Sequence, residues 1–223
     1  MWRLENVARV EAMTIVDQKA DKARAFAPFR FSRLGALARS RDGSAAIEFA
    51  MLAIPYFMVI FAILETFIAF AAEELVSNAV DTMSRRMRTG QITYNLGRST
   101  DMSQTQFRQA FCNEISILIS CSASEAATPN KLYLDVQTFS TFSAIPTTIP
   151  KVSTAKYADI NTAAFKYTPG GAGTVNMLRA YYRWEIITDL IRPYITTIRP
   201  SDGSMPTQYL IVATSAFQNE QYP

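Results

Sequence analysis

The sequence contains no histidine and only two cysteines, Cys112 and Cys121, among its 223 residues. Without histidine the chain cannot form a serine–histidine or cysteine–histidine catalytic pair. A four-ligand zinc site made of cysteine and histidine is also excluded, because the chain contains only two such residues. No carboxylate pair stands out for acid–base catalysis, so we expect no enzyme, no metal and no cofactor. The net charge of +3 is too small to indicate nucleic-acid binding.

One long apolar run occupies residues 49–72, and only Glu65 and Thr66 interrupt its 24 residues. A bilayer core needs about 20 helical residues, so the run predicts one transmembrane helix at residues 44–72. A secretory signal peptide would be shorter and nearer the start of the chain. Pro55 lies inside the run and predicts a helix kink, either without a further role or as a weak point that lets packed helices adjust.

The charges on the two sides of this run differ in sign. Arginines at positions 30, 33, 39 and 41 precede it, whereas Glu73, Glu74 and Asp81 follow it before any base. Positive charge favours the cytoplasmic side of a membrane. The pattern therefore predicts a single-pass protein with a cytoplasmic N-terminus and a C-terminal domain outside the inner membrane.

A short motif stands directly before the apolar run: Gly43, then SAAI from Ser44, then Glu48 and Phe49. A glycine, four residues, a glutamate and an aromatic resemble the cleavage site of type IV prepilins, where a membrane aspartyl peptidase cuts after the glycine. With LAIP following, the segment is most similar to TadE-type pseudopilins of the Tad (Flp) pilus. Weaker similarities are ILETF at 63–67, the two cysteines, RAYYRWEIIT at 179–188 and FQNEQYP at 217–223.

The resemblance implies a cytoplasmic basic leader at residues 1–43 that a prepilin peptidase removes, leaving Ser44 as the first residue. Met13 is a second candidate start of this leader, and residues 28–42 would either lie on the cytoplasmic lipid surface or act as a plain positive-inside anchor. The implied protein is a minor pseudopilin of the bacterial inner membrane that acts in pilus assembly for adhesion or secretion and enters the pilus. Its implied partners are the prepilin peptidase, other pilins and pseudopilins, the inner-membrane assembly platform and the lipid bilayer.

Glu48 and Glu65 are the two carboxylates of this region. After cleavage, Glu48 of one subunit could neutralise the Ser44 amine of its neighbour and fix subunit register, since two charges that are each unfavourable in an apolar core become a pair. The alternatives are a Ser44–Glu48 contact within one chain, or Glu48 at headgroup level. Glu65 lies about 25 Å further along the helix and would reach headgroup water or bind a partner in the membrane.

Beyond the membrane the sequence predicts an α+β, pilin-like fold. An apolar stripe ending at Met87 extends the helix through residues 73–90, and residues 91–223 form a small periplasmic domain. The expected elements of that domain are a helix at 104–119 and strands at 131–139, 175–188 and 208–217. Alternation in the strands predicts an antiparallel sheet with one face covered by the long helix. The segment 142–174 is predicted to be a long surface loop, mobile and open to subunit contact.

Cys112 and Cys121 are nine residues apart and would face opposite sides of an unbroken helix. A disulfide needs Cα atoms within about 7 Å, so pairing requires the helix to end before Cys121. The predicted topology places both residues in an oxidising compartment, and we expect a disulfide there. Two buried free thiols are the alternative.

Two further functions fit the pattern. One is an uncleaved, single-span assembly factor whose periplasmic domain binds other pilus or envelope proteins, which leaves Gly43 and Glu48 unexplained. The other is a periplasmic enzyme, which the missing histidine disfavours.

Overall fold

The computed structural model of the protein describes residues 41–199 and 204–222, with side chains from Ala45 onward. The elements in chain order are α3 (Arg41–Arg88), α4 (Gln104–Glu114), α5 (Ala123–Ala127), β1 (Leu132–Phe139), the 3-10 turn η1 (Phe142–Ala144), β2 (Tyr167–Thr168), β3 (Val175–Glu185), α6 (Arg192–Ile195) and β4 (Gln208–Gln218). The chain divides into two compact units, residues 1–54 and residues 55–223.

The helix α3 contains 48 residues and ends at Arg88, two residues before the predicted end at residue 90. Three arginines, the last of them Arg88, occupy its final turn, where positive charge interacts favourably with the C-terminal end of the helix dipole. Gly90 follows with a φ of 74°, a conformation that glycine adopts without steric strain. The arginines stabilise the last turn of the helix, and Gly90 then adopts the left-handed conformation that ends it.

The sheet has four strands in the order β2-β1-β3-β4. The central strand β3 is antiparallel to both long neighbours, with Ala180 opposite Leu134 on β1 and Tyr181 opposite Val212 on β4. This confirms the predicted antiparallel arrangement of the three long strands. The two-residue strand β2 pairs with β1 in parallel, so the complete sheet is mixed.

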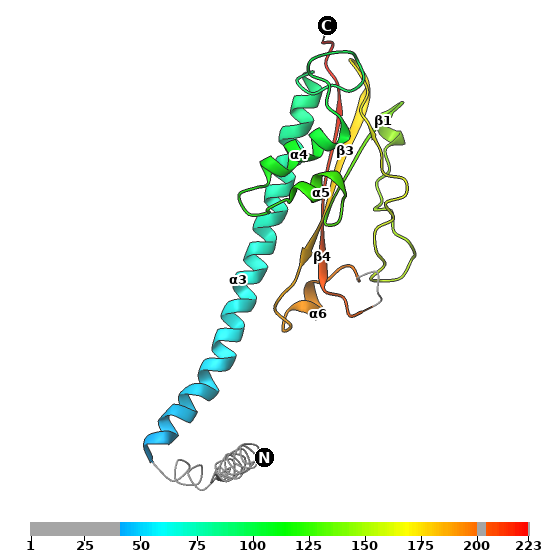
Figure 1. Ribbon diagram of the computed structural model, residues 1–223. Coiled ribbons are helices and arrows are strands. Elements are labelled where there is room, and N and C mark those ends of the chain that lie inside the picture. The colour runs from blue at the N-terminus through cyan, green and yellow to red at the C-terminus, as the bar shows by residue number, and fades with distance from the viewer. Residues whose placement is uncertain (1–40, 200–203, 223) are drawn as a thin grey trace, which may run out of the picture. The chain divides into compact units, whose positions relative to one another are not determined.

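One face of the sheet forms the main core together with the C-terminal part of α3. Val76, Val80 and Met83 on the helix belong to the same buried cluster as Leu134 and Leu178 on the strands. Met83 and Leu178 are fully buried. Figure 1 shows this part of α3 running beside β3 and β4. The predicted cover of this face by the amphipathic half of the helix is confirmed.

The opposite face of the sheet is covered over β1 and β3, whereas Thr214 and Ala216 of β4 on that face are exposed, so the expectation of only one covered face was wrong. Residues of segment 142–174 lie on it: the Phe165 ring stacks on Tyr181 with centroids 4.7 Å apart. Arg179 is buried and donates hydrogen bonds to the carbonyls of Pro146 and Thr148. The segment has little regular structure, yet it buries the arginine and tyrosine that the alternating pattern had assigned to solvent.

The helix α4 is shorter than predicted, ending at Glu114 rather than at residue 119. A capping box joins Ser103 and Gln106 at its start, and turns follow at residues 115–118. The turns bring the Cα atoms of Cys112 and Cys121 to 5.7 Å, and the two residues form a disulfide. The expected disulfide is thus confirmed, together with the break in the helix that it requires.

Candidate functional site: the apolar helix and its contacts

Gly43 and Ser44 lie within α3, and Glu48 and Phe49 follow about one helical turn later. Glu48 is exposed, and the Phe49 side chain is 72% exposed. All four residues of the predicted cleavage and register motif therefore lie on one continuous helix. The peptide bond between Gly43 and Ser44 belongs to this helix rather than to an extended segment.

Residues 47–70 of α3 present exposed apolar side chains. Large apolar side chains that are at least half exposed occur at Ile47, Phe49, Met51, Leu52, Ile54, Tyr56, Phe57, Val59, Phe61, Ile63, Phe67 and Phe70. An exposed apolar surface of this extent marks a membrane or protein contact. Among the described residues, α3 is the one helix long and apolar enough to span a membrane.

Pro55 lies inside α3, and the helix continues on both sides of it. Proline lacks the N–H that would bond to the carbonyl four residues earlier. The residue thus interrupts the hydrogen-bond ladder within the apolar segment. The predicted role of Pro55 as a kink stays a prediction.

Glu65 has partners far away in the sequence. Its two carboxylate oxygens accept hydrogen bonds from the backbone N–H groups of Ile187 and Thr188, just after β3. Glu65 thereby ties the apolar helix to the end of the sheet. Its partner lies in its own chain, which neither of the two predicted alternatives included.

A second carboxylate joins the helix to the sheet two turns later. Glu73 accepts a hydrogen bond of 2.9 Å from the hydroxyl of Tyr209 on β4. Burial, together with the hydrogen bond to the Glu73 carboxylate, raises the pKa of Tyr209 to about 12. Tyr209 therefore stays protonated and keeps donating this bond throughout the physiological pH range.

Arg108 was not singled out from the sequence, although it organises the region around the disulfide. Its side chain is 3% exposed and donates to the carbonyls of Glu125, Ala126 and Leu132. The Glu125 carboxylate in turn accepts bonds from three consecutive backbone N–H groups at residues 130–132. Burial lowers the pKa of Arg108, and the nearby Glu125 opposes this shift. In the sequence, only the position of Arg108 beside Phe107 in the predicted helix could have indicated that this arginine is buried.

The loop between α3 and α4 is held by Asp101. Its carboxylate accepts hydrogen bonds from the Thr93 hydroxyl and from the backbone N–H groups of Leu96 and Arg98. The bond from Thr93 is the main cause that lowers the pKa of Asp101. Within residues 41–199 and 204–222, acidic and cysteine side chains do not gather in a group of three that could hold a metal ion.

The match to a known family falls on the apolar helix. Residues 43–85 match the family model described as TadE-like protein. The match begins at Gly43 and ends three residues before the end of α3, so it covers the helix and not the sheet. No curated protein and no solved structure matches the chain. The resemblance found in the sequence is therefore confirmed for residues 43–85, which match the TadE-like family model.

Proposed function

We propose that the protein is a minor pseudopilin of the Tad (Flp) pilus, cut after Gly43 by a prepilin peptidase and acting in pilus assembly at the inner membrane. The observation that carries this proposal is the extent of the family match, which starts at Gly43 and follows α3 to residue 85. The mature chain would contain residues 44–223. Its partners would be other pilins and pseudopilins and the assembly platform in the membrane.

The properties of α3 suit this role. Its exposed apolar side chains offer a surface to lipid before assembly and to other pilin helices after it. Glu48 lies one turn from Ser44, so a new amine at Ser44 would bring a positive charge to the same end of the helix. The Cys112–Cys121 disulfide supports a periplasmic location of the C-terminal domain, because disulfides persist in oxidising compartments.

A second candidate function is an uncleaved single-span assembly factor, and one observation favours it. Gly43 and Ser44 lie inside α3, where backbone groups are hydrogen-bonded one turn away. A peptidase could reach the bond only after this part of the helix opens. Glycine favours such opening, since it weakens a helix by about 1 kcal/mol relative to alanine.

The N-terminal residue of the protein isolated from membranes distinguishes the two functions. Intact-mass measurement and N-terminal sequencing should find Ser44 first in a strain with the prepilin peptidase, and the uncut chain in a strain without it. The variant Gly43→Leu should remain uncut, because it adds a bulky side chain beside the cleaved bond.

The matched control is Ala50→Leu, which adds similar bulk to an exposed position of the same helix. This variant should be cut as the native chain is. An N-terminus upstream of Ser44 in the peptidase-containing strain would exclude the pseudopilin and leave the uncleaved assembly factor.

A further inference from the structure

Part of the domain lies beside the apolar segment of α3. Residues 187–195, which connect β3 to the end of α6, lie beside helix residues 59–70. One hollow of about 270 Å³ is lined by Thr66 and Phe70 on the helix and by Tyr194 and Tyr209. A more open hollow has the helix residues Val59, Ile63 and Phe67 on one side and Leu190 and Ile191 on the other.

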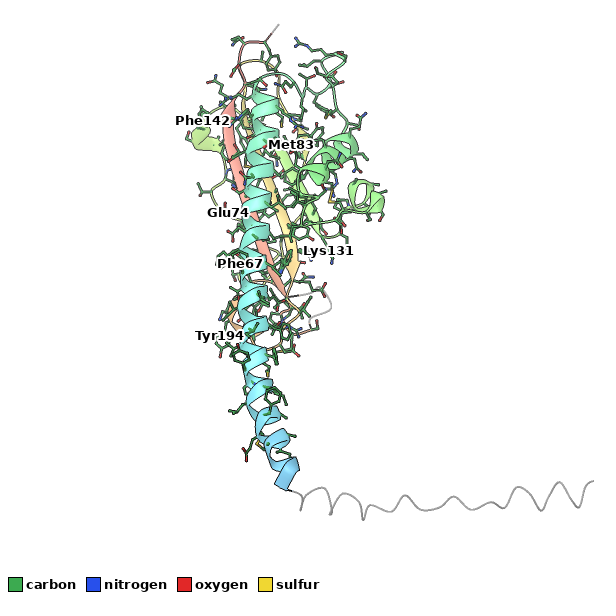
Figure 2. The ribbon with its side chains drawn as sticks, turned by 90° about the vertical axis from the view of Figure 1, so that its left-hand side faces the viewer. Phe67, Glu74, Met83, Lys131, Phe142 and Tyr194 are labelled. Atoms are coloured by element: carbon green, nitrogen blue, oxygen red, sulfur yellow. A yellow bond between two sulfur atoms is a disulfide. The ribbon has the colours of Figure 1, made fainter. Side chains whose placement is uncertain are left out.

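The same connection carries exposed apolar side chains. Ile187 is 84% exposed, Tyr194 85% and Leu190 43%. Figure 2 shows Tyr194 beside α3, on the N-terminal side of Phe67 along the helix. These exposed side chains belong to the segment that lines the two hollows beside the apolar helix.

The length of the apolar run places this surface at the membrane. A bilayer core takes about 20 helical residues, which corresponds to residues 49–68 when counted from Phe49. Helix residues 59–68 would then lie in the half of the bilayer nearer the domain. Because residues 187–195 lie beside this part of the helix, they cannot all remain in bulk water when the helix spans the bilayer.

The backbone of residues 187–195 meets part of the requirement that a lipid environment imposes, because all its N–H donors except those of Asp189 and Leu190 are hydrogen-bonded. Irregular backbone enters the apolar region only when its polar groups find partners within the protein. The N–H groups of Ile187 and Thr188 are bonded to Glu65. Those of Ile191 and Tyr194 donate to carbonyls three residues earlier. This gives the carboxylate in the apolar run a function: it satisfies donors that lipid would leave unpaired.

The charged residues of the segment are paired as well. Arg192 forms a 2.6 Å ion pair with Asp189 and donates a hydrogen bond to the carbonyl of Ile186. Tyr194 and Tyr209 combine an apolar ring with a polar tip, as do the residues that line membrane–water interfaces. The Asp189 side chain is 85% exposed, so we expect this ion pair to lie at the headgroup level of the membrane.

We propose that residues 187–195 form a membrane-docking surface, with Ile187, Leu190 and Tyr194 inserted into the outer half of the bilayer beside α3. The surface would hold the sheet at a fixed height and orientation over the membrane. This inference rests on α3 spanning the bilayer and not on cleavage after Gly43. Its occupant is lipid, and a second copy of the chain is the competing occupant.

The test is a fluorescent label at Ile187 in the full chain, reconstituted into vesicles of phosphatidylethanolamine and phosphatidylglycerol. The native cysteines are joined in a disulfide, so Ile187→Cys offers a single thiol for the polarity-sensitive dye NBD. Ile117→Cys is the matched control, since Ile117 is an isoleucine of similar exposure, 89%, on the turn after α4. Phe61→Cys marks the lipid-embedded helix.

Label at position 187 should be quenched by doxyl lipids, as at position 61, and its quenching by aqueous iodide should be several-fold weaker than at position 117. Equal iodide quenching at 187 and 117 would overturn the proposal. Protection at 187 that disappears when protein is diluted in lipid would identify a second copy as the occupant and also overturn it. Strong iodide quenching at position 61 would show that α3 does not span the bilayer and would overturn the proposal. The proposed function would still be tested separately, by whether the N-terminal residue is Ser44.

Discussion

At the scale of single residues, the polar side chains that matter most are those with distant partners. Glu48 and Glu65 both attract attention in the sequence, because each carboxylate interrupts or borders an apolar run. The sequence could not predict that Glu65 binds the backbone at Ile187, since those two residues are 122 positions apart. Arg108 was missed for a related reason: an arginine on an amphipathic helix is normally exposed, and only the fold shows that three carbonyls surround it.

Arg108→Ala should lower the free energy of unfolding by about 3 kcal/mol or more, because three buried carbonyls lose a charged donor and Glu125 loses its cation. Arg108→Lys should recover only part of the loss, since an ammonium lacks the planar fork of the guanidinium. The measurement is urea unfolding of the full chain in detergent micelles, followed by tryptophan fluorescence.

The control for this series is Arg85→Ala, which removes an exposed arginine from the last turn of α3. A change of that kind should stay within about 0.5 kcal/mol. If Arg108→Ala unfolds at the same urea concentration as the Arg85 variant, the buried arginine does not hold the α4–β1 region together.

At the scale of elements, the sequence predicted those elements that have a regular spacing of apolar residues. The long helix and the three long strands follow from apolar spacing of 3.6 and 2 residues. The segment 142–174 has neither period, so no pattern in the sequence indicated that Phe165 would stack on Tyr181. The end of α4 was also mispredicted, because the apolar pattern continues to Ile119 while the backbone turns at Ile115. Leu118 accordingly faces solvent at 40% exposure, and Ile119 is buried in its place.

The disulfide fixes this turn, and removing it should destabilise the protein. The double variant Cys112→Ser with Cys121→Ser should lose about 2–3 kcal/mol of unfolding free energy, since a crosslink over nine residues restricts the unfolded chain. The comparison is urea unfolding with and without a reducing agent. The native chain should move to lower urea on reduction, while the double variant should not respond. Equal stability of the two proteins would show that the turn is held by Ile115, Ile119 and their neighbours alone.

At the scale of the whole molecule, the two ends of α3 have different roles. Its C-terminal part forms the core with the sheet and binds it through Glu73 and Tyr209. Its N-terminal part bears the motif at Gly43 and the exposed apolar surface. Residues of the C-terminal part pack within one chain, and their substitution should lower the free energy of unfolding. Substitution of residues in the N-terminal part should instead affect processes that involve a membrane or another chain, such as cleavage and assembly.

Glu48 is the residue at which this division is most directly tested. If the chain is a pseudopilin, cleavage creates an amine at Ser44, and a carboxylate on a neighbouring subunit can neutralise it within the apolar packing of the helices. Glu48→Gln should leave the N-terminus at Ser44 and the unfolding free energy unchanged. Its recovery in a sheared pilus fraction should fall by about tenfold or more, which corresponds to loss of roughly 1.4 kcal/mol of association free energy.

The matched control is Glu74→Gln, which removes one exposed carboxylate from the same helix within the unit of residues 55–223. It should be cut and recovered with pili as the native chain is. Glu65→Gln completes the comparison, because Glu65 binds the domain of its own chain and its loss should lower stability instead. Normal recovery of Glu48→Gln in pili would contradict pairing between subunits and favour a Glu48 that acts within its own chain.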